Sequence, residues 1–284
     1  MSIIAAAHQS LLGVATNPLA VSLRAKILLW SDMSETSGST AVERIEGNTG
    51  TYVNMGSYTV TGPFGNNAKR FGNFDDSRLA FPQTTLNQRR SDFTVMVVFK
   101  RDTTDVSGYL YRRAGTGDSA AQNAEIYATN ADVDSKISFS TVAINGTASP
   151  ATGHKPFAAN SLYDGNYHQL CWGYTRTGAL EAATTSTTKF HVDGALNTTY
   201  TNLSGDNGGL YHGAVGTPCT SSGTTFSEYN VGGKATGSNS HRGPNSAIAQ
   251  FIVIAGLISD AEAAYLYNGG AFKAWAAFNS ESGG

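Results

Sequence analysis

Short apolar runs recur along the chain from Ala25 onward, with polar and turn-forming residues between them. Asp92–Lys100 and Ala247–Ala255 are almost continuously apolar at their centres, and Tyr167–Thr175 is nearly as strong. Weaker strand patterns cover Ile27–Trp30, Thr51–Val53, Tyr58–Val60, Arg78–Phe81, Gly108–Tyr111, Ala124–Tyr127, Lys136–Val142, Lys189–Val192 and Asn230–Gly233. Many short strands separated by turns predict an all-β fold, an antiparallel two-sheet sandwich.

Two local signals are more specific than the strand pattern. Asp193-Gly194 sits between β-prone residues and predicts a hairpin turn, because both central positions of such a turn need a positive φ. Ser259 and Glu262 form a capping box, which predicts one short C-terminal helix over Ser259–Tyr267. A second helical turn is expected over Ala271–Phe278.

The two ends of the chain differ from the middle. Residues 1–25 show no strong period, and we predict an N-terminal arm; residues 26–278 form one sandwich, and residues 279–284 form a short polar tail. The arm is too apolar to be a solvated tail, so we expect it to dock on its own sandwich or on a neighbouring subunit. The predicted assembly residues are Leu11, Leu12, Val14, Leu19 and Val21.

Several segments, in order, resemble the laminin-G-like and pentraxin-like branch of the concanavalin-A-like lectin superfamily. They are LLWSDMSETSGSTAVERIEGNTGTYVN, GPFGNNAKRFGNFDDSRLAF, SDFTVMVVFK, YDGNYHQLCWGYTRTG, KFHVDGAL and IAQFIVIAGLISDAEAAYLYNGG. Tyr167 replaces the usual tryptophan of the fourth segment. The resemblance spans residues 27 to 272 and implies a jelly-roll sandwich, with His168 in a structural role. It does not reach residues 1–25.

Composition excludes several classes of protein. The net charge is −2 and there is no block of Lys or Arg, so the chain lacks the electrostatic footprint of a nucleic-acid-binding protein. Two cysteines, Cys171 and Cys219, are too few for a disulfide scaffold, and their pairing stays open. The N-terminus has no cationic region typical of a secretory signal, and its apolar stretch is too interrupted to span a membrane. We therefore expect synthesis in a host cytoplasm.

Catalytic patterns are absent from the sequence. A glycoside hydrolase on this fold needs two carboxylates that face each other across the scissile bond. Only separate acids are found, including Glu43, Glu46, Glu125 and Asp134, and no nucleophile elbow or phosphate loop is present. The sequence therefore predicts a protein that is not an enzyme.

Calcium is the one cofactor that the resemblance suggests. The segment that matches the acidic turn of pentraxin-like relatives carries Asp75 and Asp76, which become candidate calcium ligands. The second acidic loop of such sites matches residues 232–246, which contain no Asp or Glu. Calcium takes six to eight oxygen ligands. The alternative is that the two aspartates only order their own turn.

Three functions follow from the sequence. The leading hypothesis is a structural or adhesive protein on a virion surface, such as a bacteriophage decoration protein, that docks on sister subunits through its arm. The alternative is a stand-alone carbohydrate-binding lectin module that contacts a cell-surface glycan, and the third is a glycoside hydrolase. Candidate ligand-binding residues are aromatic or imidazole side chains on loops and strand ends: Tyr109, Tyr111, Tyr211, His212 and Tyr229.

Overall fold

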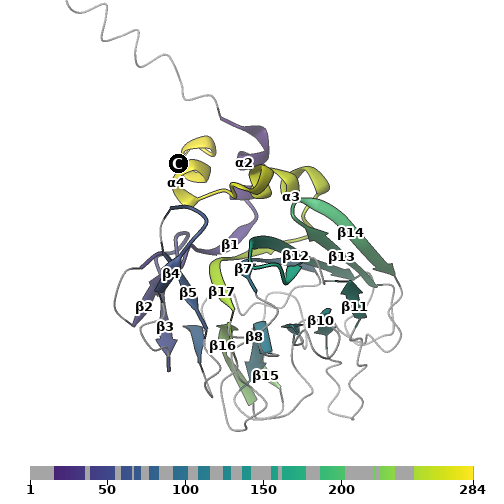
Figure 1. Cartoon of the computed structure of the whole chain (residues 1–284). Coiled ribbons are helices and arrows are strands. Elements are labelled where there is room, and N and C mark those ends of the chain that lie inside the picture. The colour runs from purple at the N-terminus through teal and green to yellow at the C-terminus, as the bar shows by residue number, and fades with distance from the viewer. Residues whose placement is uncertain are drawn as a thin grey trace, which may run out of the picture.

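The computed structural model describes fifteen segments of the chain. They are residues 16–35, 39–54, 59–65, 67–71, 77–82, 92–101, 108–115, 124–128, 136–141, 155–158, 162–176, 186–201, 220–221, 224–233 and 246–283. These segments form two antiparallel sheets and a group of short helices at one end of the molecule (Figure 1). The all-β, two-sheet sandwich predicted from the sequence is confirmed, whereas its jelly-roll connectivity stays a prediction.

The first sheet has the strand order β14-β13-β12-β7-β17-β5-β4, and β1 pairs with β17 beside that path. Its strands are β1 (Ile27–Ser31), β4 (Thr59–Thr61), β5 (Asn67–Arg70), β7 (Asp92–Lys100), β12 (Tyr167–Arg176), β13 (Ser186–Val192), β14 (Ala195–Thr201) and β17 (Ala247–Ala255). The two most apolar segments of the sequence, β7 and β17, pair with each other at the centre of this sheet.

The second sheet has the order β11-β10-β9-β8-β16-β6-β3-β2, and β15 pairs with β16. Its strands are β2 (Thr40–Val42), β3 (Thr49–Val53), β6 (Arg78–Pro82), β8 (Gly108–Gly115), β9 (Ala124–Ala128), β10 (Lys136–Thr141), β11 (Lys155–Ala158), β15 (Thr220–Ser221) and β16 (Thr224–Val231). Every pairing described in both sheets is antiparallel.

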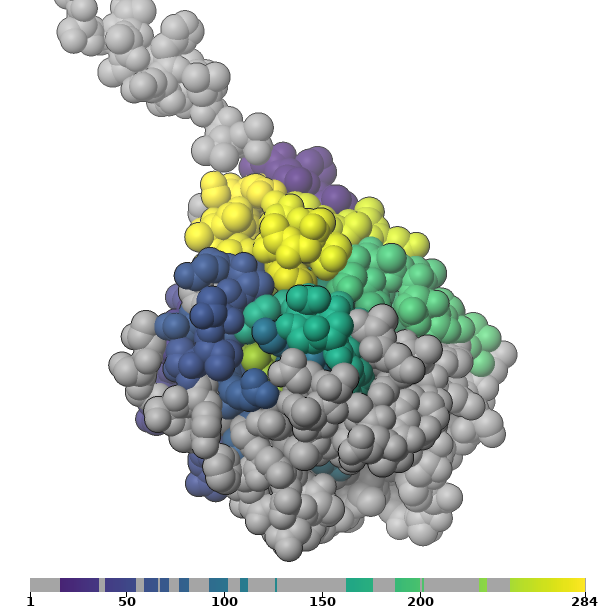
Figure 2. All heavy atoms as spheres, in the orientation of Figure 1, coloured from purple at the N-terminus to yellow at the C-terminus, as the bar shows by residue number. Residues whose placement is uncertain are grey.

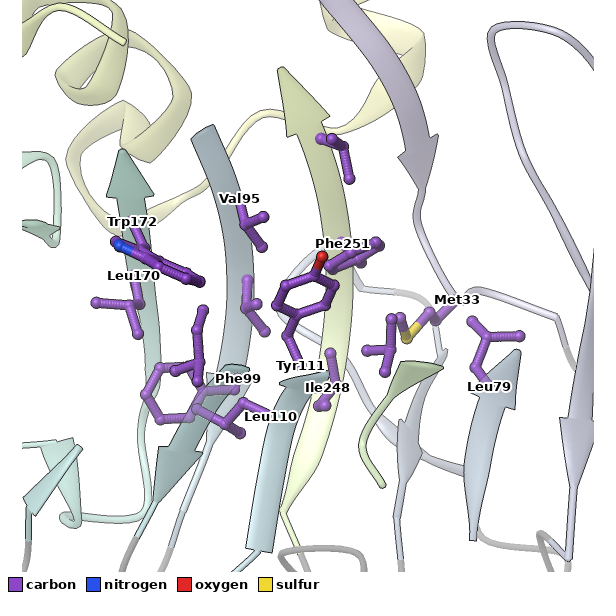
Figure 3. Packing of buried hydrophobic residues seen from close by; sticks show 14 of the residues in the cluster. Met33, Leu79, Val95, Phe99, Leu110, Tyr111, Leu170, Trp172, Ile248 and Phe251 are labelled. Atoms are coloured by element: carbon purple, nitrogen blue, oxygen red, sulfur yellow. The ribbon is translucent and has the colours of Figure 1, made fainter. Parts of the chain in front are cut away.

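The main core lies between the two sheets. Alternate residues of β7, from Phe93 to Phe99, point into it, and the other sheet contributes Tyr111 of β8 and Leu79 of β6 to the same cluster. Figure 3 shows Val95 and Phe99 on one side of Tyr111 and Leu79 beside Met33 on the other. The Tyr111 ring stacks on Phe251 of β17, with 5.4 Å between ring centroids. This packing removes the apolar faces of both sheets from water, which is the main source of stability for a sandwich.

A second core covers the outer face of the first sheet. The helices α2 (Pro18–Arg24), α3 (Asp260–Tyr267) and α4 (Trp275–Glu281), with the 3-10 turn η4 (Asn268–Gly270), form what we call the helical cap. Trp30 of β1 points into the cap and packs on Trp275 and Phe278 at ring-centroid distances of 5.4 and 4.8 Å. The cap gathers at one end of the molecule (Figures 1 and 2).

The ends of the chain contribute to this cap. Ala20 and Leu23 of α2 are fully buried, and the backbone N–H of Asn17 donates to the carbonyl of Glu281 at 2.9 Å. Lys26 pairs with the buried Glu262 of α3. The second half of the predicted arm therefore docks on its own sandwich, and α4 extends into the predicted polar tail as far as Glu281. Residues 1–15 lie outside the described residues.

Both local sequence signals are confirmed. Asp193 and Gly194 have φ values of 50° and 76°, as the hairpin turn between β13 and β14 requires. Ser259 caps α3 through the predicted box, because its hydroxyl accepts the N–H of Glu262 while Glu262 accepts the N–H of Ser259. Asn268 then ends the helix in the left-handed conformation. Cys171 is a free, fully buried thiol, and Cys219 lies outside the described residues.

Candidate functional site

The outer faces of the two sheets carry different side chains. Along β7 and β17 nearly every residue is buried, because one set points into the main core and the other into the helical cap. On β2 and β3 buried and exposed positions alternate instead: Ala41 and Tyr52 point inward, while Thr40 and Thr51 are exposed. No described helix packs on the outer face of the second sheet. The part of this outer face that lies on β2 and β3 is exposed, and we call it the open face; towards β6 and β16 the outward residues Ala80 and Asn230 are buried.

Strand register aligns four residues across the outer face of the second sheet, from the exposed Thr40 and Thr51 to the buried Ala80 and Asn230. Thr40 pairs with Thr51, Thr51 with Ala80, and Ala80 with Asn230, so one row crosses β2, β3, β6 and β16. We call these four residues the polar row. It places two exposed hydroxyls, a small methyl group and an amide side by side, with neighbouring strands about 4.8 Å apart. The exposed threonine hydroxyls can both donate to and accept from a polar ligand, and beyond Asn230 the same register continues to Arg112 of β8.

Asn230 is the unusual member of the row. The next residue, Val231, belongs to the main core, so the side chain of Asn230 faces the other way. Asn230 is 0% exposed, and neither its Oδ1 nor its Nδ2 has a hydrogen-bond partner. Nothing in the local sequence marked this residue, because Asn in a β-strand is ordinarily a surface residue.

The predicted aromatic site is only partly present. Tyr109 is half-buried on β8, and the irregular register between Tyr109 and Tyr111 directs both Leu110 and Tyr111 into the main core. Tyr111 is fully buried there, so its prediction as a ligand-binding residue is corrected: it is a core residue. Tyr229 lies on β16 beside Asn230, and Tyr211 and His212 lie outside the described residues.

The predicted assembly and metal residues are distributed as follows. Leu19 is half-buried and Val21 is 45% exposed, both on α2, while Leu11, Leu12 and Val14 lie outside the described residues.

The candidate calcium ligands Asp75 and Asp76 also lie outside the described residues. In the described part of the chain, no group of three or more His, Cys, Asp or Glu side chains is placed to hold a metal ion. No described helix is long and apolar enough to cross a membrane.

His168 forms the most compact polar cluster of the first sheet. Its Nδ1 lies 2.8 Å from Asp193 Oδ2 and its Nε2 lies 3.0 Å from Asp164 Oδ1. Because carboxylates only accept, both contacts are hydrogen bonds only when the imidazole is protonated on both nitrogens. Burial lowers the pKa of His168, but the hydrogen bonds and charges of the two aspartates outweigh it and raise the pKa. The predicted structural role is confirmed: His168 ties the turn before β12 to the β13–β14 hairpin.

Another polar cluster joins Tyr52 of β3, in the second sheet, to Lys69 of β5, in the first, through Glu35. Lys69 of β5 donates to the carbonyl of Glu35 at 2.6 Å and lies 5.3 Å from the centroid of the Tyr52 ring. Tyr52 Oη donates to Glu35 Oε2 at 3.0 Å. Burial, together with the charge and hydrogen bond of Glu35, raises the pKa of Tyr52, so this phenol is not activated as a nucleophile. The cluster pairs the polar groups at the edge where β3 and β5 meet.

Glu43, one of the acids singled out in the sequence, also has a structural role. Its buried carboxylate accepts the backbone N–H groups of Trp30 at 3.2 Å and Glu46 at 2.6 Å, and that of Ile45. These bonds hold the turn after β2 against β1. Glu46 is exposed on the same turn.

No protein-family model matches the chain, and no curated protein does. Similar solved structures include the binding domain of botulinum neurotoxin serotype D, with a TM-score of 0.53, 10% identity, and coverage of 89% of this chain and 53% of that one. The binding domain of Paraclostridial Mosquitocidal Protein 1 has a TM-score of 0.53 and 10% identity, over 87% of this chain and 52% of that one. Trypanosoma rangeli sialidase, in complex with 2,3-difluoro-KDN, has a TM-score of 0.51 and 11% identity.

The sialidase match covers 86% of this chain but only 32% of the sialidase chain. At such low identity these likenesses show the fold alone, an all-β fold found in toxin binding domains and in sialidase chains. They give no specific support to a laminin-G-like family or to a role in a virion. The prediction that the chain is not an enzyme is corrected, because similar structures include sialidases and a sialidase mutant that displays trans-sialidase activity.

Proposed function

We propose that this chain is a carbohydrate-binding, lectin-like sandwich whose ligand lies on the open face of the second sheet. The observation that carries the proposal is the contrast between the faces: the first sheet is buried under the helical cap, whereas the second exposes the hydroxyls of Thr40 and Thr51 on β2 and β3. Binding sites with a few placed polar groups on a rigid scaffold are typical of small-ligand recognition.

The comparisons support the class of ligand without naming it. The similar toxin structures are binding domains, and one similar Trypanosoma rangeli sialidase structure is in complex with 2,3-difluoro-KDN. The chain spans about half of the toxin domains and a third of the sialidase chain, so their partners and activities are not transferred as such. What is carried over is a fold compatible with glycan recognition.

The test is glycan binding with the open face blocked. The purified full chain is screened on a glycan array that includes sialylated and neutral oligosaccharides, and hits are measured by calorimetry. Thr51→Arg places a long charged side chain on the open face, and Ala277→Arg places the same side chain on the exposed surface of α4 as a matched control. We expect Thr51→Arg to weaken binding at least tenfold and Ala277→Arg to leave it unchanged.

Two results would contradict the proposal. One is a full chain that binds no glycan on the array while it remains folded. The other is equal loss of binding in both arginine variants, which would show that the open face is not the contact surface. Release of free sugar from bound glycans during the same experiment would identify turnover in addition to binding.

A further inference from the structure

The outer surface of the helical cap carries almost no charge. Among the described residues of its helices, Asp260 is the one exposed charged side chain, and it lies 2.8 Å from the imidazole of His191. The other charged side chains are engaged within the cap, in the pairs Arg24–Asn279, Lys26–Glu262 and Lys273–Glu281. Helices that face water normally carry a charged face, and depletion of charge is typical of surfaces that become covered in an assembly.

Exposed apolar side chains follow one another across α2, α3 and β14. Val21 and Leu196, 45% and 42% exposed, are two of the three exposed large hydrophobic residues in the described chain. Leu196 pairs with His191, whose imidazole bonds to Asp260 of α3, so Leu196 lies on the cap side of the first sheet. Because α3 contacts both α2 and β14, the three elements lie side by side (Figure 2). We call the following exposed residues the apolar cap patch: Val21, Ala25, Ala195, Leu196, Ala261 and Ala264.

The patch is too small to hold a stable dimer by itself. Specific interfaces bury about 800 Å² on each partner, from about 20–30 residues. A partner must therefore bring apolar surface of its own, and residues 1–15 can supply it. This segment contains no Asp, Glu, Lys or Arg, and its large aliphatic residues are Ile3, Ile4, Leu11, Leu12 and Val14. An uncharged segment can cover an uncharged patch without burying an unpaired charge.

The contacts at the start of α2 indicate which patch the segment reaches. The N–H of Asn17 donates to the carbonyl of Glu281 at the end of α4, and Thr16 packs near Gly283. A chain that folds back over its own helix is often fixed by packing of the residue before the N-cap on the fourth helical residue. These residues are Thr16 and Val21, and both are exposed. In the described residues, therefore, no such contact turns the preceding chain towards its own patch.

We infer that residues 1–15 of one copy dock on the apolar cap patch of a second copy, and that two copies exchange these segments reciprocally. Each copy gives one segment and receives one, so the exchange is closed and has two-fold symmetry. It covers the exposed Val21 and Leu196 with apolar side chains. This inference goes beyond the proposed function, and its test needs no glycan.

The first experiment compares the full chain with a chain that begins at Thr16. The shorter chain keeps α2, with its buried Ala20 and Leu23, and therefore keeps both cores. Sedimentation velocity over a wide range of protein concentration gives the mass of each, and urea unfolding gives its midpoint. We expect a dimer for the full chain and a folded monomer for the shorter one.

Point variants of the full chain locate the contact. Val21→Lys and Leu196→Lys each place a charge in the patch, whereas Val42→Lys places the same charge at the third exposed large hydrophobic residue, on the second sheet. Burial of an unpaired charge is unfavourable, so we expect each patch variant to weaken dimerisation about tenfold or more. Val42→Lys should keep the dissociation constant of the wild type, and circular dichroism checks that all three variants are folded.

A mixing experiment shows whether the segment and the patch touch between copies. The chain that begins at Thr16 has an intact patch and no segment, whereas the full-length double variant Val21→Lys/Leu196→Lys has the segment and a damaged patch. Each should be monomeric alone. An equimolar mixture should form a heterodimer, detected by sedimentation of the fluorescently labelled shorter chain, because the segment of one chain can dock on the patch of the other.

Several results would contradict the exchange. A monomeric full chain does so, and if its unfolding midpoint is also higher than that of the shorter chain, residues 1–15 dock on their own chain. A shorter chain that still dimerises shows that the segment is not needed for association. Loss of the dimer in Val42→Lys places the interface on another face, and a mixture without heterodimer shows that segment and patch do not meet between copies.

Discussion

The two sheets of the sandwich differ in what lies on their outer faces. The outer face of the first sheet packs Trp30, Met96 and Ile252 against the helical cap, and these side chains are fully buried. The second sheet presents Thr40, Thr51 and the 42% exposed Val42 to solvent on β2 and β3. The outer face of the first sheet therefore adds to stability, whereas the exposed positions of β2 and β3 can change their surface chemistry without loss of the core.

The largest expected effect tests the covered face. Trp30→Ala removes a fully buried indole that packs on Trp275 and Phe278, and it also removes the donor of a 2.7 Å hydrogen bond to Asp32. Large-to-small changes of this kind cost about 3–5 kcal/mol. We expect a loss of that size in the free energy of unfolding, measured by urea denaturation with fluorescence and far-ultraviolet circular dichroism.

The matched substitution on the open face is Val42→Ala. Surface substitutions usually change stability by less than about 0.5 kcal/mol, and Val42 makes no contribution to either core cluster. If Trp30→Ala and Val42→Ala had similar small effects, the helical cap would not stabilise the first sheet and the contrast between the two faces would be lost.

An intermediate effect distinguishes two hairpin turns. Gly194, beneath α3, and Gly47, between β2 and β3, both have a positive φ, of 76° and 73°. A Cβ added at Gly194 would lie 2.8 Å from Tyr267 Cβ, whereas at Gly47 nothing lies within 4 Å. Both changes to Ala suffer the unfavourable φ, of about 1 kcal/mol.

We therefore expect Gly194→Ala to be more destabilising than Gly47→Ala by about 1–2 kcal/mol, because only the first also displaces a packed helix. Thermal unfolding of the two variants beside the wild type measures the difference. Equal losses would mean that α3 moves away from the turn at no cost, and the cap would then be a looser layer than its buried residues indicate.

Much of the covered half could be predicted from sequence, because its signals are local. The continuous apolar runs of β7 and β17, the Asp193-Gly194 turn and the Ser259 capping box each specify one element. By contrast, α2 was interpreted as part of an arm, although Asn17 followed by Pro18 is a helix-start signal. The structure shows its role, because α2 contacts α3 and α4 and buries Ala20 and Leu23 in the second core.

The open half could be predicted less well, because its features arise from register between distant strands. The polar row joins residues 40, 51, 80 and 230, and no local pattern links them. The short strand β2 (TAV) carries too few apolar residues to stand out. Tyr111 was wrongly assigned to a binding site because sequence alone does not reveal the irregular register that turns it into the core.

The smallest expected effect concerns the pH dependence of the covered sheet. The raised pKa of His168 means that the folded state favours the charged imidazole. Its contribution to the free energy of unfolding is therefore complete below the unfolded pKa of about 6.5 and is lost as pH rises through the folded pKa. Burial opposes ionisation of Asp164, but hydrogen bonds from His168 and Asn166 lower its pKa to about 2. The contribution of Asp164 to the free energy of unfolding is present above pH about 4 and is lost as pH falls towards 2.

We expect stability to fall on the alkaline side by about 1 kcal/mol as one hydrogen bond of His168 is lost, measured as melting temperature between pH 5 and 9. In His168→Asn this fall of the melting temperature at alkaline pH should be smaller. In Asp164→Asn the fall at acid pH should be smaller, whereas a fall at alkaline pH should remain, because Asp193 still accepts a hydrogen bond from the imidazole. An unchanged fall at alkaline pH in His168→Asn would show that the first sheet owes its pH response to another group, and that the hairpin is held to the sheet mainly by its packing against α3.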